Sequence, residues 1–362
     1  GRWEFFPDPT QQHTPDSLGA DGSGRSIRVP GPWQAQFEDL RDYSGVAWYR
    51  VRFDPVEAGP GVWMLRFGAV DYFTHCGTDG AHDLFEGTEE VHRKGYLTDL
   101  LSERAAAWVG RQTGPFFLSL HYTAPHWPWE TRDDEAESKR IAKIVHTDGG
   151  SVATYLKMIR HMDEGIGRVL QALKDSGAER DTIVVFTSDN GGERFSDTWP
   201  LVGRKMDLLE GGIRVPYIVR WPARVKPGGI TAQQAITMDW VATFLEAAGV
   251  SPNPGYPLDG LSLLPVFQGK TIERELYWRM NFRQQRALRA GKWKYLSVEG
   301  DEFLFELETD PRERANYRRR EEKVFAGLKE KYAAWQASMP PIPPDALVSI
   351  PYSKSDLTSP AS

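Results

Sequence analysis

The stretch TIVVFTSDNGGERFSDTWPLVGRKMDLLEGGIRVP, residues 182–216, combines a strand pattern with reactive side chains. It begins with an apolar, β-prone run at 182–187, which predicts a buried strand. That run ends abruptly in Ser-Asp-Asn-Gly-Gly, and Lys205 and a second Gly-Gly pair follow before the next apolar run. Open α/β sheets bind ligands at the carboxyl ends of their strands, so Asp189 and Asn190 stand where a site is expected.

Helical and strand-like patterns alternate on both sides of this stretch. Apolar helical spacing runs from 96 to 112, and a longer helical stripe begins at Val152 and ends near Gly177. The other predicted elements are a buried strand at 116–122, a strand in VPYIVRW (215–221) and a helix in MDWVATFLEAAGV (238–250). This rhythm favours an α/β fold with a largely parallel sheet.

The two ends of the chain differ from this central region. Short β-prone runs within 1–70 predict antiparallel strands, and further runs between 275 and 308 predict a small antiparallel sheet. A charged helix from about Arg319 to Trp335 closes that sheet. We therefore expect a β segment (1–70), an α/β domain (71–270), a C-terminal sheet and helix (271–338), and an extended or disordered tail rich in Pro and Ser (339–362).

Composition and charge narrow the possible functions. The 362 residues carry a formal charge of −6, which gives no electrostatic reason to expect a nucleic-acid partner. Cys76 is the single cysteine, which excludes an internal disulfide and a cysteine-cluster metal site. No run approaches the roughly 18 consecutive apolar residues of a membrane span, and the first residues lack a signal-peptide layout, so the localisation stays unassigned.

Asp189 and Asn190 offer hard oxygen ligands, which Ca²⁺ and Mg²⁺ prefer. Ca²⁺ takes about 6–8 oxygens, so the pair needs further ligands, and a plain tight turn explains the same residues. Two other features favour a site. His126 follows a predicted strand and Lys205 follows the Asp-Asn turn, and together they offer a proton donor and a cation to an anion.

A series of motifs from about Val70 to Tyr317 resembles the formylglycine-dependent sulfatases, a family of the alkaline phosphatase superfamily. The motifs are His-Tyr-Thr-Ala-Pro-His-Trp-Pro, HMDEGIGRVL, FTSDNGG, GRK, EGGIRVPYIVRWP, TMDWVATFLEAAGV, LDGLSLLPVFQG and ALRAGKWKYLSVEGDEFLFELETDPRERANY. The resemblance implies a partial sulfatase-like α/β fold, with a mixed or parallel sheet, flanking helices and a small C-terminal antiparallel sheet. It also implies a sulfuric ester hydrolase acting on a sulfated small molecule or glycan, often periplasmic or secreted in bacteria.

Carried over residue by residue, the resemblance assigns roles to four side chains. Asp189 and Asn190 become ligands of a Ca²⁺ ion, with Mg²⁺ as the alternative. Lys205 and His126 become the catalytic and substrate-binding contacts to the sulfate and leaving-group oxygens.

Other residues near these motifs have two interpretations each. His121 is either a neighbour of the site or a strand-end histidine with a structural partner. Glu210, Arg214 and the Gly211-Gly212 pair shape the loop and orient the site, although a structural salt bridge explains the Glu and the Arg equally well.

The residues that the family uses for bond making are not found. Its mechanism needs a cysteine or serine in Cys-x-Pro-x-Arg, oxidised to formylglycine, whereas Cys76 stands in His-Cys-Gly-Thr-Asp-Gly and no serine heads such a motif. The Asp-Asp pair of the calcium shell and a Lys-x-His are also missing, because Asp133-Asp134 lies in the polar TRDDEAESKR, which predicts a solvated helix or loop. We therefore expect this chain alone to be impaired or inactive.

Residues 1 to about 70, and most specifically those from 25 onward, resemble part of the sugar-binding jelly-roll domain of β-galactosidase-like and β-glucuronidase-like glycoside hydrolases. The resemblance rests on Pro-Gly-Pro-Trp-Gln, Asp-Tyr-Ser-Gly-Val-Ala-Trp-Tyr-Arg and Leu-Arg-Phe-Gly-Ala-Val-Asp-Tyr. Both resemblances meet at 68–73, so we interpret the chain as a chimera joined there, by recombination or by sequence misassembly. Two partial domains leave strand edges unpaired, which favours self-association.

Three functions compete. Sulfate-ester hydrolysis is the leading interpretation. A non-catalytic carbohydrate-binding or scaffold protein is the second, with Trp33, Trp48 or Trp127 as stacking platforms, although tryptophans are usually core residues. A phosphomonoester or phosphodiester hydrolase of the same superfamily is the third, because the predicted metal ligands do not distinguish sulfur from phosphorus.

Overall fold

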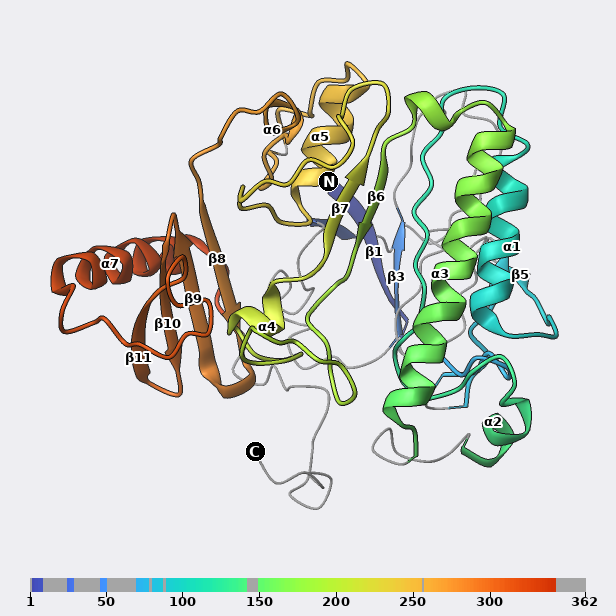
Figure 1. Ribbon diagram of the computed structural model, residues 1–362, viewed down its shortest axis with the longest axis horizontal. Coiled ribbons are helices and arrows are strands. Elements are labelled where there is room, and N and C mark those ends of the chain that lie inside the picture. Colours follow the sequence, from blue (N-terminus) through green and yellow to red (C-terminus); the bar gives the residue numbers. More distant parts are fainter. Residues whose placement is uncertain are drawn as a thin grey trace. The chain divides into compact units, whose positions relative to one another are not determined.

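The computed structural model describes residues 2–8, 25–28, 46–50, 70–77, 80–86, 89–141, 149–255 and 257–342 (Figure 1). The chain forms two compact units. Among the described residues, the site unit comprises 70–231 and 311–313, and the C-terminal unit comprises the described residues of 2–50 with 232–310 and 314–342. All the candidate site residues belong to the site unit. None of the helices in the described ranges is long and apolar enough to cross a bilayer.

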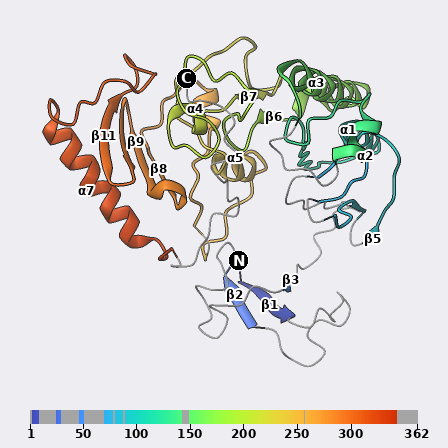
Figure 2. The ribbon, with the colours of Figure 1, turned by 90° about the horizontal axis from the view of Figure 1, so that it is seen from below.

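A pair of packed helices forms one layer of the site unit. α1 (Leu97–Val109) and α3 (Val152–Asp175) lie side by side in two perpendicular views (Figures 1 and 2), which confirms both predicted helices. The helices approach closely at Gly165, where an added Cβ would meet the Oγ of Ser102 at 2.1 Å. Ser151 starts α3, because its side chain accepts a hydrogen bond from a backbone N–H of the first turn.

β6 (Val184–Thr187) and β7 (Tyr217–Arg220) confirm the strands predicted at 182–187 and in 215–221. The mixed α/β class is confirmed too. The largely parallel sheet is not seen, because every strand pairing in the described residues is antiparallel. A parallel pair needs a long crossover, usually a helix, whereas the connection from β6 to β7 contains only the short α4 (Glu210–Ile213) and returns the chain in the opposite direction.

The buried strand predicted at 116–122 is wrong. The segment has no paired strand within the described parts of the chain, and its side chains alternate between half-buried and exposed. Phe116 and Leu118 pack against the cluster formed by α1 and α3, whereas 60% of Phe117 is exposed. The apolar run indicates here only that one face of the segment is buried. An extended segment becomes a strand through hydrogen bonds to a neighbouring strand, and the run gives no information about such a neighbour.

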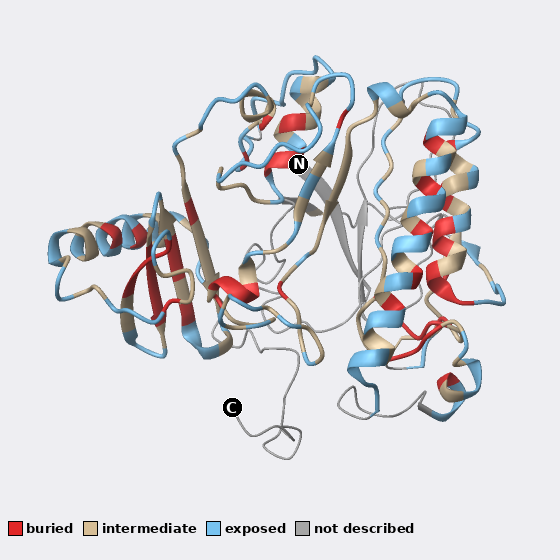
Figure 3. Cartoon of the chain, in the orientation of Figure 1, coloured by how far each residue is buried: buried red, intermediate tan, exposed pale blue. Residues whose placement is uncertain are grey.

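The remaining elements of the site unit are short. β4 (Phe85–Glu86) pairs with β5 (Glu89–Glu90), α2 (Glu135–Ile141) precedes α3, and the 3₁₀ turn η3 (Glu179–Asp181) precedes β6. Buried positions on α1 and α3 are separated by exposed ones along each helix (Figure 3). The main buried cluster of this unit contains Val70, Tyr72, Leu84, Tyr96, Leu97, Leu101, Ala124, Trp129 and Met158.

The C-terminal unit contains the small antiparallel sheet and the helix that the sequence predicts. Its strands lie in the order β11-β10-β9-β8, with α7 packing Leu328 and Tyr332 into their buried cluster. The bounds are β8 (Glu275–Met280), η4 (Phe282–Gln284), β9 (Gln285–Ala290), β10 (Trp293–Val298), β11 (Asp301–Glu306) and α7 (Glu322–Ser338).

Two shorter helices precede that sheet. α5 (Asp239–Ala247) confirms the helix predicted at 238–250, and α6 (Leu264–Phe267) follows it. The buried carboxylate of Asp239 accepts hydrogen bonds from the Arg274 guanidinium at 2.5 Å and from the Leu261 N–H at 2.9 Å. These contacts hold the start of α5 against the segments on either side of α6.

Three strands are described near the N-terminus. β1 (Arg2–Asp8), β2 (Arg25–Arg28) and β3 (Val46–Arg50) form an antiparallel sheet in the order β2-β1-β3, which confirms antiparallel strands within 1–70. A jelly-roll domain is not shown by these strands. Trp33 and the tail from 343 lie outside the described residues, and the four-part division of the chain stays a prediction.

Candidate site at the end of strand β6

Asp189 and Asn190 lie in the turn that follows β6. Asp189 is exposed, and its Oδ1 accepts hydrogen bonds from the Asn190 N–H at 2.9 Å and the Ser188 hydroxyl at 3.3 Å. The Nδ2 of Asn190 donates to the Gly191 carbonyl at 2.9 Å. Within the described residues, no hydrogen bond engages the Oδ2 of Asp189 or the Oδ1 of Asn190, so each side chain keeps one oxygen available for a ligand.

These two oxygens are of the chemical type that a hard divalent cation prefers. Carboxylate and amide oxygens are the ligands of Ca²⁺ and Mg²⁺, but Ca²⁺ takes about 6–8 of them. In the part of the chain that the structure describes, Asp189 belongs to no group of three neighbouring His, Cys, Asp or Glu ligands. The pair alone offers too few oxygens for a complete coordination shell, and its role as a metal site stays a prediction.

The two Gly-Gly pairs allow the backbone of the 188–216 loop to close on itself. The Gly191 N–H donates to the Gly212 carbonyl at 2.8 Å, and the Gly211 N–H donates to the Val202 carbonyl at 2.7 Å. A Cβ on Gly191 would lie 1.9 Å from the Gly211 oxygen, and a Cβ on Gly211 would lie 2.2 Å from the oxygen of Gly203. These approaches exclude any larger residue, so the glycines fix the path of the loop.

Lys205 is held in the same loop and contacts His126. Its backbone N–H donates to the Gly192 carbonyl at 2.8 Å, which ties it to the Asp-Asn turn. Its Nζ lies 3.1 Å from the Nε2 of His126 and 3.5 Å from the carboxylate of Glu193, and 19% of its side chain is exposed. The structure therefore brings together Lys205 and His126, two of the residues that the sequence predicts for one site.

Hydrogen bonds fix both the backbone and the ring of His126. The Tyr72 hydroxyl donates to the His126 carbonyl at 2.9 Å, and the ring Nδ1 lies 2.8 Å from the Trp127 carbonyl. A carbonyl only accepts, so Nδ1 carries the proton and Nε2 accepts from the Lys205 ammonium. Burial lowers the pKa of His126 below its ordinary value, and the charge of Lys205 lowers it further, against the opposing effect of the Trp127 hydrogen bond.

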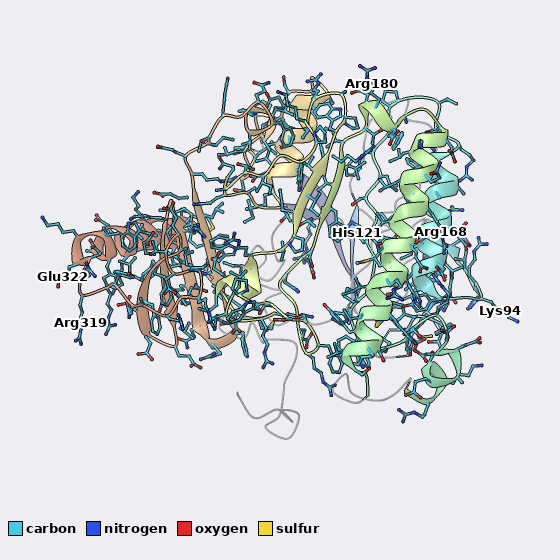
Figure 4. All side chains as sticks on the ribbon, viewed as in Figure 1. Lys94, His121, Arg168, Arg180, Arg319 and Glu322 are labelled. Carbon is cyan, nitrogen blue, oxygen red and sulfur yellow. The ribbon has the colours of Figure 1, made fainter. Side chains whose placement is uncertain are left out.

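His121 is not brought to this pair by any contact in the described residues. Its Nε2 lies 2.7 Å from the Ser119 hydroxyl and its side chain is exposed. Figure 4 labels it, together with Arg168 on α3. Of the two interpretations, a histidine with a local structural partner agrees with this geometry, although its segment is no strand.

Glu210 and Arg214 shape the far end of the loop. Glu210 is buried and Arg214 is exposed. The Glu210 N–H donates to the carboxylate of Glu313 at 2.6 Å, and the Arg214 N–H donates to the Glu210 carbonyl at 2.7 Å. These backbone contacts anchor α4, which carries Gly211 and Gly212.

Sequence reasoning missed two residues that support the Lys205–His126 pair. Glu193 contacts Lys205 and follows the first Gly-Gly pair directly, so an acid at this position in the loop was an available signal. Tyr72 supports the His126 backbone from 54 positions away, and no local pattern indicates that contact.

Neither Cys76 nor Asp133-Asp134 supplies the missing family features. The Cys76 thiol donates a hydrogen bond to the Thr74 carbonyl at 3.4 Å. The sequence around Cys76 does not fit the precursor motif of formylglycine, so we assign no chemical step to a formylglycine at this position. The Asp134 carboxylate accepts hydrogen bonds from the Thr131 N–H at 2.7 Å and from its hydroxyl at 2.6 Å. Of the predicted solvated helix or loop around Asp133-Asp134, the structure shows a turn directly before α2.

Comparisons with known proteins show the family of the chain. A family model described as Sulfatase matches residues 48–250, and one described as N-sulphoglucosamine sulphohydrolase, C-terminal, matches residues 203–338. The first match begins upstream of Val70, so it includes part of the segment that resembles a jelly roll.

Individual relatives and structures extend these matches. The chain is 32% identical over 280 residues to the uncharacterized sulfatase YdeN of Escherichia coli (strain K12), a match that covers 74% of the chain and 47% of YdeN. It is 31% identical over 192 residues to N-acetylgalactosamine-6-sulfatase of Homo sapiens, which covers 50% of the chain and 34% of that protein. It is also similar to the crystal structure of Ps i-CgsB in complex with k-i-k-neocarrahexaose, with a TM-score of 0.61, 28% identity, and coverage of 71% and 60% of the two chains. The chain thus spans about half or less of the length of these curated relatives.

Proposed function

The chain belongs to the sulfatase family, and we propose that the protein hydrolyses sulfate esters of carbohydrates. The family implies a formylglycine and a divalent metal ion in general. Support for a carbohydrate comes from the similar proteins, one of which is an N-acetylgalactosamine-6-sulfatase, while another was crystallised with k-i-k-neocarrahexaose. Because the chain spans about half of its curated relatives, the activity and the substrate class are proposals.

The contact between Lys205 and His126 carries the proposal. A lysine ammonium has three N–H donors, so Lys205 can donate to a sulfate oxygen while it keeps its contacts with His126 and Glu193. Its charge is attracted to the anion in a half-buried setting, where electrostatic attraction is stronger than in water. His126 accepts a hydrogen bond from Lys205 through Nε2. We assign to His126 the contact with the leaving-group oxygen, which requires Nε2 to release Lys205 and to carry a proton.

Asp189 and Asn190 would hold the divalent cation, for which we propose Ca²⁺. A bound cation polarises the oxygens of an ester that it contacts. The two side chains supply hard oxygens at the end of β6, and the hydrogen bond between Lys205 and Gly192 keeps the lysine backbone close to the same turn. The turn and the lysine thus offer one charged sulfate group both an adjacent cation site and a hydrogen-bond donor.

The nucleophile is a separate matter. The sequence contains no Cys-x-Pro-x-Arg motif, so we assign to the described residues the binding and orientation of the ester and not the attack on sulfur. We therefore expect the purified chain to bind sulfate esters and to turn over little or none. Self-association through unpaired strand edges stays a prediction.

Titration calorimetry with 4-nitrophenyl sulfate in Ca²⁺, beside a turnover assay, tests the proposal. A hydrogen bond to a charged group contributes about 1.5–3 kcal/mol, so Lys205→Ala should weaken binding roughly 10- to 100-fold. Lys226→Ala, which changes an exposed lysine, is the matched control and should bind as the wild type does. Equal binding by the wild type and Lys205→Ala would contradict the assignment of Lys205. Tighter binding of 4-nitrophenyl phosphate than of the sulfate would contradict the sulfate specificity.

A further inference from the structure

A second cluster of metal-type ligands lies around the β4–β5 pair, outside the 188–216 loop. One ligand atom from each of His82, Glu90 and His92 lies within 4.8 Å of the other two. In the described ranges, no other group of three such side chains comes this close together. We propose that His82, Glu90 and His92 form a binding site for a first-row divalent cation, with zinc as the metal.

The three side chains come from both arms of the β4–β5 hairpin. Glu90 ends β5 and His92 follows two residues later, a spacing at which the side chains of an extended chain project from the same face. Val91, between them, packs toward the buried cluster, and its N–H donates to the Leu84 carbonyl at 3.0 Å. His82 precedes β4 on the other arm, so the site joins both arms of the hairpin.

The distances suit a shared ion. The Nε2 of His92 lies 3.0 Å from the Oε1 of Glu90, and the ring centroids of His82 and His92 are 4.3 Å apart. Nitrogen and oxygen ligands about 2.0–2.1 Å from a tetrahedral zinc ion lie roughly 3.3 Å from each other. The side chains of His92 and Glu90 are 76% and 48% exposed, so they can rotate the short remaining distance toward a common ion.

His82 makes the kind of backbone hydrogen bond that metal-binding histidines usually make. Its Nε2 lies 2.9 Å from the Val91 carbonyl, and because a carbonyl only accepts, Nε2 carries the proton. Nδ1 is then the unprotonated nitrogen that a metal requires. A hydrogen bond from the second ring nitrogen to a carbonyl fixes both the tautomer and the direction of the ring, which favours metal binding.

The ligand types select the metal. Two imidazoles and one carboxylate suit zinc and related transition ions, whereas Ca²⁺ and Mg²⁺ prefer all-oxygen sites. This site therefore differs in preference from the Asp189-Asn190 pair. Three protein ligands leave one tetrahedral position for water or another exogenous ligand. Lys94, two residues after His92, is exposed. Its label in Figure 4 shows where this segment lies.

Titration calorimetry of the untagged full chain with Zn²⁺, at constant pH, tests the proposal. The wild type should bind one Zn²⁺ ion per chain tightly. His92→Ala and Glu90→Gln should each lower the Zn²⁺ affinity by at least about 10- to 100-fold, because even the loss of a residue that only hydrogen-bonds to a ligand lowers metal affinity by that much. Glu89→Gln, at the exposed neighbouring position, is the matched control and should bind normally. Asp189→Ala should also retain the zinc equivalent.

Spectra and folding controls sharpen the result. Co²⁺ in place of zinc should give visible absorption bands of tetrahedral intensity in the wild type and in Glu89→Gln, and these bands should be absent from His92→Ala. Circular dichroism and melting curves should show that every variant is folded, because the changes at Glu90 and His92 are made at exposed positions. A wild type without a tight zinc equivalent, or a His92→Ala variant with unchanged zinc affinity, would overturn the proposal.

Discussion

The Nζ of Lys205 lies 3.1 Å from the Nε2 of His126, although 79 positions separate the two residues in the sequence. Nδ1 keeps its proton and donates it in a hydrogen bond to the Trp127 carbonyl, so the neutral imidazole faces the ammonium with Nε2 as the acceptor. A second proton on this ring would place two positive charges at hydrogen-bond distance. The pair therefore exists in its present form only while His126 is neutral.

This relationship predicts how His126 titrates. Burial and the charge of Lys205 both lower the pKa of His126, so NMR titration of the ring nitrogens should give a value below the ordinary figure of about 6.5. Lys205→Met should raise that pKa, because the positive neighbour is removed. The pKa should still stay below the ordinary value, since burial is the larger cause. The same pKa in the wild type and in Lys205→Met would show that Lys205 does not act on the ring.

Glu130 and Asp71 form a buried pair of acids next to Trp129 and Tyr72 of the main buried cluster of the site unit. Glu130 is 0% exposed, and neither of its carboxyl oxygens has a hydrogen-bond partner among the described residues. Burial and the nearby Asp71 raise the pKa of Glu130 to about 9, so it is protonated at neutral pH. Burial also raises the pKa of Asp71, but hydrogen bonds from Thr74, Phe73 and Ser138 outweigh it, and the net pKa is lowered.

The raised pKa of Glu130 predicts that the folded chain loses stability as the pH rises. The unfolded chain releases this proton at the ordinary carboxyl pKa, whereas the folded chain keeps it up to a higher pH. The stabilisation is therefore complete below the ordinary pKa and is lost as the pH rises through the folded value. The free energy of unfolding should fall between about pH 5 and pH 9, by at most about 1.4 kcal/mol per pH unit from this group.

Urea unfolding at several pH values measures this effect. Glu130→Gln removes the titrating group, so its stability should depend less steeply on pH than that of the wild type. Glu330→Gln, at an exposed position on α7, should reproduce the wild-type slope. Parallel stability curves for the wild type and Glu130→Gln would contradict a buried, protonated Glu130.

The glycine contacts of the loop predict a specific sensitivity to an added methyl group. Gly191→Ala would place a Cβ 1.9 Å from the Gly211 oxygen, and a backbone atom cannot rotate away as a side chain can. Overpacking costs roughly 1–3 kcal/mol, so we expect a lower melting temperature and weaker binding of sulfate esters. Gly114→Ala is the control, because nothing lies within 4 Å of its added Cβ. A fully stable Gly191→Ala with normal binding would show that the loop follows another path.

Much of the fold could be predicted from local patterns. The helical stripes of α1 and α3, the alternating runs of the C-terminal sheet and the apolar run of β6 all report which face of an element is buried, and the structure confirms them. Pairing direction is not encoded locally. The segment 116–122 looks like a strand because it is apolar, yet it has no paired neighbour in the described residues, and β6 and β7 pair antiparallel where a parallel sheet was expected.

The candidate site shows the same division. Residue types after predicted strands suggested Asp189, Asn190, Lys205 and His126, and the structure places Lys205 against His126 although the described segment 116–122, which precedes His126, is not a strand. The supporting contact from Tyr72 depends on the folded chain, so no spacing in the sequence predicts it. The proposed zinc ligands could not be predicted as a set, because His82 and Glu90 come close together only in the folded hairpin. The Glu-x-His spacing at 90–92 was a local indication of two of the three ligands.

The melting temperature with and without Ca²⁺ tests directly whether Asp189 and Asn190 hold a cation in the folded chain. A ligand that binds only the folded state stabilises it by about 2.7 kcal/mol at 100 times its Kd, so the wild type should melt several degrees higher in Ca²⁺, and EDTA should reverse the rise. His92→Ala and Asp163→Asn, which change residues outside this turn, should show the same rise, whereas Asp189→Ala should show none. An unchanged melting temperature for the wild type in saturating Ca²⁺, or an equal rise in Asp189→Ala, would contradict the assignment of the site.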